Sequence, residues 1–381
     1  MVTFLHTLDK PSLSTAFVIW MSLLLGAPSL IYGQEKSRNF PVPQTPFAPQ
    51  EYVVYQTRDS ITIDGKMDEA SWQQAKWTDS FVKAASKGNV MPEYATKVKV
   101  LWDEDYLYVG AYLEDPHLWS TMHERDMPLH LANAFEIFID PDKDTYNYIE
   151  LQINALGTIW DLYLSRPYRD GGQGISDYNL LNYHSAVHLD GTINEPGPED
   201  EGWSLEYAIP IPSILALDTD KQSLSDGDQW KVNFQRAQRR LEVTDGEYQL
   251  AQDPTTNKPY PPDYSVWSPQ GIINIHYPEM WGLLQFSEAT VGDDEVPFEA
   301  DPGQPYKWLL RQLYYEMKEF QSYHGYFPNN IQALNIKDPL WAEYQDRIMV
   351  ETTRSLFQIT LMIKESETVW HINHLGRIWS N

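Results

Sequence analysis

The sequence predicts a mainly β protein: an antiparallel β-sandwich followed by a small C-terminal α+β appendage. From about residue 51 to 288, apolar and polar residues alternate with period two in many short segments, the pattern of half-buried strands. Turn-forming residues separate these segments, and helical periodicity is rare among them. Many short strands with few helices favour two packed antiparallel sheets.

The alternating segments give the strands that we expect in this body. They are 97–102, 106–114, 134–139, 146–154, 157–164, 202–208, 230–237 and 281–286. Turn signals such as Asp103-Glu104-Asp105 and Asp226-Gly227-Asp228 lie between them. Short helices are expected at 67–77 and 211–216.

The chain begins with the pattern of an export signal. Residues 15–32 form an apolar run that follows Lys10, and small residues, including Gly33, follow the run. We therefore predict a signal peptide over 1–33, and export to the periplasm, the cell surface or the medium. An uncleaved anchor helix is the alternative, because the run approaches the length that spans a bilayer. No transmembrane span is expected in the mature chain.

Composition excludes several classes of site. The formal net charge is −26, so the chain would repel a phosphate backbone and nucleic acid is a poor partner. There is no cysteine, which excludes disulfides, thiolate nucleophiles, zinc–cysteine sites and iron–sulfur clusters. The hydrophobic content of 42% is ample for a packed core.

Alternation also assigns side chains to the two faces of three predicted strands. The expected core residues are Phe135, Ile137, Ile139, Ile149, Leu151, Ile153, Val232 and Phe234. The opposite face then carries Glu136, Tyr148, Glu150, Gln152, Asn154, Asn233 and Gln235. If these strands are neighbours, the amides and carboxylates form one patch, which suits a polyhydroxylated ligand. The alternative is an ordinary solvated face of an antiparallel sheet.

Four motifs in this body resemble the family 9 carbohydrate-binding modules. They are Ile63-Asp64-Gly65-Lys66 with Trp72, Leu101-Trp102-Asp103-Glu104-Asp105-Tyr106, Phe135-Glu136-Ile137-Phe138-Ile139-Asp140-Pro141, and Trp281-Gly282-Leu283. The resemblance spans about residues 51–288. It implies a β-sandwich that binds sugars between two tryptophans, binds calcium, and works beside enzymes of polysaccharide breakdown.

The resemblance also implies a set of ligand-binding residues. The family's binding glutamate falls on Glu136, its polar pair on Gln152 and Asn154, and a late-strand glutamine on Gln235. The two stacking tryptophans are replaced, one near His130 and the other near Ile275 and His276. Other aromatic residues are then candidates for a stacking surface: Trp160, Tyr163, Trp267 and Tyr277.

Asp140, Asp142 and Asp144 alternate in a turn and are the predicted metal ligands. Converging carboxylates favour calcium, although Thr145 replaces the glycine of an EF-hand loop. An acidic hairpin turn without metal is the alternative. Heme is not expected, although residues that can ligate it are present: His123, His130, His276 and Met280.

Three functions remain open at this point. The first is an exported carbohydrate-binding protein that acts in polysaccharide binding or breakdown. The second is a glycoside-hydrolysing enzyme on the same polar face, where Glu136 and Glu150 would supply the two carboxylates. No catalytic residue is assigned, because the short catalytic signatures are absent. The third is a scaffold whose appendage recruits a protein partner.

The remaining segments complete the expected domain organisation. The proline-rich residues 34–50 predict a linker or extended arm, and residues 289–304 an acidic linker. Residues 305–381 form the appendage, with a helix at 306–323 and a hairpin from 355–363 and 368–379. We expect it to dock on the sandwich or on a partner.

Overall fold

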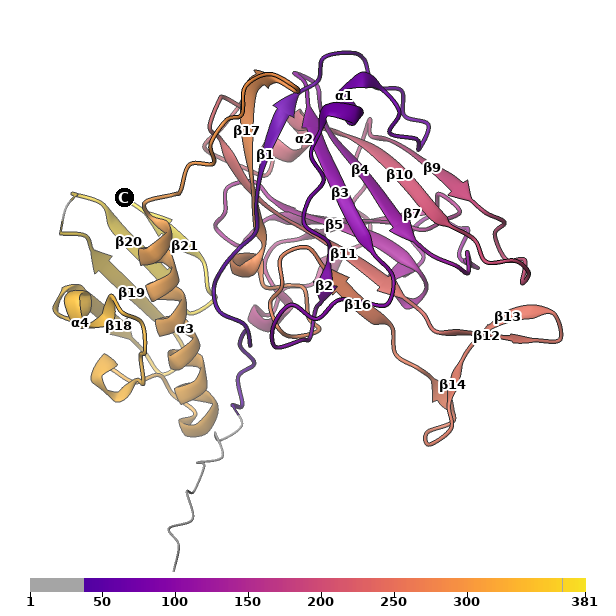
Figure 1. The fold of residues 1–381 in the computed structure, drawn as a ribbon. Coiled ribbons are helices and arrows are strands. Elements are labelled where there is room, and N and C mark those ends of the chain that lie inside the picture. The colour runs from indigo at the N-terminus through magenta and orange to yellow at the C-terminus, as the bar shows by residue number, and fades with distance from the viewer. Residues whose placement is uncertain (1–37, 365) are drawn as a thin grey trace, which may run out of the picture. The chain divides into compact units, whose positions relative to one another are not determined.

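The alternating body folds into two facing layers of strands (Figure 1). The computed structural model describes residues 38–364 and 366–381, so the predicted signal peptide lies outside the described residues. No helix among the described residues is long and apolar enough to span a membrane. The mainly β prediction is confirmed.

One path of hydrogen-bonded strands runs through both layers. Its order is β8 (Gly174–Ile175), β7 (Ile159–Leu164), β6 (Tyr148–Ile153), β5 (Ala134–Asp140), β11 (Gln229–Gln238), β17 (Gly282–Thr290), β1 (Glu51–Gln56), β3 (Thr96–Trp102), β4 (Tyr106–Glu114), β10 (Gly202–Pro210) and β9 (His184–Asp190). In addition, β16 (Asp263–Val266) pairs with β11, and β2 (Val82–Lys83) pairs with β16. This places β6, β5 and β11 side by side, as the polar-patch hypothesis requires.

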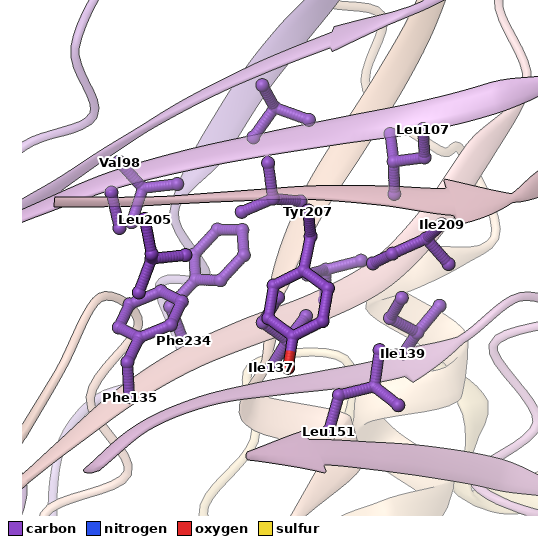
Figure 2. Packing of buried hydrophobic residues seen from close by; sticks show 14 of the residues in the cluster. Val98, Leu107, Phe135, Ile137, Ile139, Leu151, Leu205, Tyr207, Ile209 and Phe234 are labelled. Carbon is purple, nitrogen blue, oxygen red and sulfur yellow. The ribbon is translucent and has the colours of Figure 1, made fainter. Parts of the chain in front are cut away.

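The main core lies between the two layers. Figure 2 shows Val98, Leu107, Leu205 and Ile209 from β3, β4 and β10 facing residues of β5, β6 and β11. The second group comprises Phe135, Ile137, Ile139, Leu151 and Phe234. The core assignments from alternation in these three strands are therefore confirmed. Each fully buried aliphatic or phenyl side chain contributes roughly 1.5–3 kcal/mol by leaving water.

The first sequence motif is a structural clamp. Glu206 on β10 is fully buried and accepts hydrogen bonds from the Gly65 backbone N–H at 2.7 Å and from Trp72 Nε1 at 2.7 Å. Gly65 has φ +90°, and a Cβ there would lie 2.6 Å from the backbone nitrogen of His188. Glycine is required because this turn passes directly against β9.

The structure also corrects details of the sequence prediction. The two helices are shorter than expected, α1 (Ala70–Gln74) and α2 (Ile211–Leu215). The strand β1 was not predicted, and it pairs in parallel with both β17 and β3 within an otherwise antiparallel sheet. Also unpredicted were β9, β16 and two small hairpins: β12 (Leu241–Thr244) with β13 (Glu247–Leu250), and β14 (Gln252–Asp253) with β15 (Lys258–Pro259).

The C-terminal part has its own apolar cluster. The helix α3 (Gln304–His324) packs against a four-stranded sheet of β18 (Ile348–Thr352), β19 (Phe357–Met362), β20 (Val369–Asn373) and β21 (Ile378–Ser380). The expected hairpin is present as β19 with β20. A short helix, α4 (Trp341–Tyr344), contributes Tyr344 to the cluster.

The predicted arm runs along this C-terminal part. Phe40 and Val42 pack against the α3 cluster, and the Phe47 ring stacks on Trp308 of α3 at 4.2 Å between ring centroids. The backbone of Gln44 donates to the carbonyl of Gln270 at 3.0 Å. Residues Asn39–Asn381 thus form one compact unit.

Candidate functional site

A straight row of polar side chains crosses four strands. Gln235 of β11 pairs with Glu136 of β5, Glu136 with Gln152 of β6, and Gln152 with Trp160 of β7. Directly paired residues on one sheet face lie next to one another. The structure therefore brings together four of the residues that the sequence singled out.

Hydrogen bonds link the row internally but leave several atoms without a partner. Gln235 Nε2 donates to Glu136 Oε2 at 2.6 Å, and Gln152 Nε2 donates to Glu150 Oε1 at 2.5 Å. The described residues offer no hydrogen-bond partner to Glu136 Oε1, Glu150 Oε2, Gln235 Oε1 or Trp160 Nε1, all of which are buried. Buried polar atoms are rarely left unpaired, because each costs about 1–3 kcal/mol. The row and the neighbouring Glu150 therefore present three oxygen atoms and one N–H group to a bound molecule.

The face that carries this row is not an open solvated face. Glu136 is 1% exposed and Gln152 is 1% exposed. A second apolar cluster packs on this face, formed by Ala84, Phe138, Tyr148, Leu162, Leu164, Val266, Ile275 and Trp281. Val266, Ile275 and Trp281 come from the segment 263–281, which crosses the face. The solvated alternative is therefore wrong.

Partly exposed aromatic rings form a rim around the row. The His130 ring stacks on Trp160 with centroids 5.3 Å apart and planes at 25°, and the His130 backbone N–H donates to Gln152 Oε1 at 2.9 Å. Tyr168 meets His276 edge to face at 4.6 Å. The Tyr264 hydroxyl donates to the carbonyl of His130 at 3.4 Å. A polar floor beneath aromatic side chains is suited to a sugar ring, which has polar edges and an apolar face.

Burial controls the charges of the two glutamates. Burial raises the pKa of Glu136 well above its usual range, and the nearby charge of Glu150 raises it further. Burial also raises the pKa of Glu150 to about 7. The two carboxyls therefore hold protons more tightly than exposed glutamates do.

His276 is neutral in this environment. Burial, with the charge of Arg169, lowers its pKa to about 3. Its Nδ1 is 3.0 Å from the Tyr148 hydroxyl, and its Nε2 is 3.7 Å from Glu150 Oε2. A neutral imidazole leaves the Glu150 carboxyl without a compensating positive charge.

Several residues proposed from the sequence lie elsewhere or are already engaged. Both ends of the Asn154 amide are used within the chain: Nδ2 donates to Ser120 Oγ, and Oδ1 accepts from the backbone N–H groups of Leu156 and Thr158. Asn154 therefore stabilises the turn after β6. Trp267 and Tyr277 are buried in the protein, and Tyr163 packs against the main core on the opposite face of β7. These three rings supply no stacking surface.

Three site residues were missed as ligand candidates. Glu150 was noted on the polar face, and alternation was the signal that could have placed it in the site. Tyr168 lies on the short helix η2 (Tyr168–Asp170), and Tyr264 lies on β16. Neither segment shows alternation, since prolines and glycines interrupt both.

The three aspartates predicted as metal ligands do meet. One carboxylate oxygen of each of Asp140, Asp142 and Asp144 lies within 4.8 Å of the others. Burial and the neighbouring carboxylates raise the pKa of Asp142 to about 7. The turn holds Thr145 at φ +74°, which is strained for a β-branched residue. Hard oxygen ligands in mutual repulsion fit a divalent cation such as calcium.

A buried ionic network joins the rim to α3. Arg169 of η2 is 2.9 Å from Glu279 through Nη2 and 3.2 Å from Asp170 through Nε. Burial alone would raise the pKa of Glu279, but the charges of Arg169 and Arg311 outweigh it and hold this pKa at about 2. Lys318 of α3 lies 3.4 Å from Asp170. The network therefore holds in place both loops that carry Tyr168 and His276.

Residues 63–163 match the family described as "Carbohydrate family 9 binding domain-like". This match confirms the resemblance seen in the sequence. The family 9-like region contains Glu136, Glu150, Gln152, Trp160 and His130. It excludes Gln235 and His276, which come from later strands and loops.

Two curated xylanases share this region. The chain is 35% identical over 89 residues to endo-1,4-beta-xylanase C of Paenibacillus barcinonensis, covering 23% of this chain and 7% of that protein. It is 37% identical over 91 residues to endo-1,4-beta-xylanase A of Thermotoga maritima, covering 23% of this chain and 8% of that protein. The chain thus spans less than a tenth of the length of these relatives.

Two solved structures are among those to which this chain is similar. One is a family 9 carbohydrate-binding module from Caldicellulosiruptor kristjanssonii in complex with cellotriose, at 16% identity and a TM-score of 0.40, covering 66% of this chain and 100% of that one. The other is a putative carbohydrate-binding protein from Bacteroides uniformis, at 16% identity and a TM-score of 0.46, covering 63% of this chain and 100% of that one.

Proposed function

We propose that this protein binds carbohydrate through the row Gln235–Glu136–Gln152–Trp160 and its aromatic rim. The observation that carries the proposal is a set of buried, unpartnered atoms in the row and on the neighbouring Glu150: Glu136 Oε1, Glu150 Oε2, Gln235 Oε1 and Trp160 Nε1. Sugar hydroxyls both donate and accept hydrogen bonds, so they can satisfy acceptors and a donor together. The family 9-like region, whose solved relative holds cellotriose, supports the same ligand class.

We propose that the protein acts outside the cytoplasm, in polysaccharide binding or breakdown. The apolar N-terminal run supports export, and intact Met1 in the exported protein would contradict signal cleavage. The shared region in two xylanases supports a role beside polysaccharide-degrading enzymes. Sugar release during a binding assay would instead favour the hydrolytic alternative, in which the coupled carboxyls of Glu136 and Glu150 act on the ligand.

Replacing Glu136 with glutamine tests the site. The amide oxygen of the new side chain must accept from Gln235 Nε2, which turns an NH₂ group toward the position of Glu136 Oε1. A sugar hydroxyl that donates there loses its acceptor, which costs about 1–3 kcal/mol. We expect affinity for neutral gluco- and xylo-oligosaccharides, measured by calorimetric titration, to fall about 5- to 100-fold.

Glu288→Gln is the matched control. Glu288 lies on β17 and is exposed. Its replacement with glutamine is the same substitution, made away from the row. Its affinity and melting temperature should equal those of the unmodified protein. Unchanged sugar affinity in Glu136→Gln would refute the site, and a large loss of stability together with affinity would show that Glu136 is structural.

We also propose that Asp140, Asp142 and Asp144 hold calcium, which would stabilise the strained turn after β5. A cation bound only by the folded state stabilises it by about 2.7 kcal/mol at a hundredfold excess over its dissociation constant. We expect calcium to raise the melting temperature by several degrees relative to a chelator, and Asp142→Asn to abolish the rise. Equal melting temperatures with calcium and with chelator would contradict the calcium site.

A further inference from the structure

A cleft at the end of β11 gathers positive charge on a strongly acidic chain. Its volume is about 520 Å³, and its lining includes Lys83, Arg236, Arg239 and Arg240 but only two carboxylates, Glu93 and Asp263. The whole chain carries a formal net charge of −26. A local excess of positive charge in such a protein focuses anions on this one place.

Two of the four cations form ion pairs with carboxylates of this chain. Lys83 Nζ lies 2.7 Å from Asp263 Oδ2. The side chain of Arg236 is 2% exposed and lies 3.4 Å from Asp115 Oδ2. Arg236 is therefore inaccessible to an incoming anion, and the partly exposed Lys83 already has a carboxylate partner.

Arg239 and Arg240 have no such partner. Among the residues that the structure describes, no carboxylate forms an ion pair with either side chain. Arg239 is only 9% exposed, and within the described part of the chain its Nε lacks a hydrogen-bond partner. Arg240 is exposed, with its guanidinium 5.0 Å from the centre of the Tyr260 ring. Two adjacent guanidinium groups thus line the cleft, one of them with an unsatisfied buried donor.

The cleft lies at the end of the strand that carries Gln235 of the proposed sugar site. Arg239 follows β11 four residues after Gln235, about 13 Å along an extended chain. Its backbone N–H donates to Asn133 Oδ1 at 2.7 Å, just before β5. Tyr264, whose hydroxyl contacts the carbonyl of His130 in the rim, pairs with Ala237 between the two places. Arg239, directly after β11, is therefore the residue that links the two places.

We propose that Arg239 and Arg240 bind the carboxylate of a uronic acid residue in an acidic polysaccharide, an inference that rests on the proposed carbohydrate function. The planar guanidinium fork matches a carboxylate with two parallel N–H···O bonds. The Tyr260 ring beside Arg240 offers an apolar surface to a sugar. Most of this acidic protein would repel an acidic polymer. Arg239 and Arg240 would therefore determine where the uronic acid residue binds.

The test uses a matched pair of ligands, a xylo-oligosaccharide with and without one glucuronic acid substituent, titrated calorimetrically at low salt. The full chain should bind the acidic ligand about tenfold or more tightly than the neutral one, and the preference should shrink as salt is raised. Arg240 is exposed, so Arg240→Gln leaves packing intact and should remove much of the preference for the acidic ligand. The double variant Arg239→Gln/Arg240→Gln should remove all of it. Affinity for the neutral ligand should not change in either variant.

The control is Arg347→Gln with Arg354→Gln, two exposed residues of the C-terminal part, which changes the net charge equally and should keep the preference. Neutral ligand bound without preference for the acidic one overturns this inference and leaves the carbohydrate function standing. Absence of binding to either ligand overturns both. An equal or stronger preference for a sulfated oligosaccharide of the same charge overturns the assignment to carboxylate.

Discussion

Replacing Arg169 with alanine is expected to cost about 3–5 kcal/mol of folding stability, because it leaves buried carboxylates without their main counter-charge. The Arg169 side chain is 3% exposed and serves both Glu279 and Asp170. Its guanidinium also lies 4.3 Å from the centre of the Tyr277 ring. The free energy of unfolding from urea titration measures the loss.

A surface pair provides the comparison. Arg58 and Asp293 lie 3.3 Å apart with 48% and 57% of their side chains exposed, so Arg58→Ala should cost less than about 1 kcal/mol. Since Arg169 holds the loops of Tyr168 and His276, sugar affinity of Arg169→Ala should fall even at temperatures where the protein stays folded. A loss of stability no larger than that of Arg58→Ala would show that the buried network is weak.

The second large effect concerns pH. Burial raises the folded-state pKa of Glu150 to about 7, above the ordinary value of 4.5. A raised acid pKa adds stability that is fully present below the unfolded value and is lost as pH rises through the folded value. Stability from this group should therefore fall between about pH 4.5 and 7, by about 3 kcal/mol.

Glu150→Gln removes this contribution, together with the charge that raises the pKa of Glu136. The amide keeps an acceptor for Gln152 Nε2 but cannot ionise. We expect the variant to be more stable than the unmodified protein at pH 8 and nearly equal to it at pH 4.5. Thermal melts of both proteins with saturating calcium keep the state of the Asp140–Asp144 turn the same. Parallel profiles of stability against pH for the two proteins would contradict the raised pKa of Glu150.

Apolar–polar alternation predicted the strands that form most of the main core. It missed strands whose formation depends on contacts with distant parts of the chain. β5, β6 and β11 alternate because one face packs on the core, but the pattern left open whether the three strands are neighbours in the sheet. β1 was missed, since a strand between two parallel partners need not alternate. The hairpins of residues 241–259 bury little, so no apolar pattern marks them.

The site was partly predictable for the same reason. Alternation placed Glu136, Gln152 and Gln235 on one face, and register then aligned them. Sequence gave no sign that the segment 263–281 crosses that face and buries it, because long-range packing leaves no period. Asn154 shows where alternation is insufficient. Its position in the alternating segment 146–154 predicted the same face as the row, but its amide makes hydrogen bonds to Ser120 and to the turn that follows.

The central position of β1 sets the order in which the sheet can be assembled. Glu51 pairs with Leu283, and the rest of β1 pairs along β17. On the order of 10–50 s of ribosomal synthesis separate the two strands, at about 5–20 residues per second. Until β17 emerges, the edges of β1 and β11 that it will join remain open to strands from other chains. The nascent protein is therefore most prone to misassembly just before β17 is made, and a fragment that ends before Gly282 should aggregate.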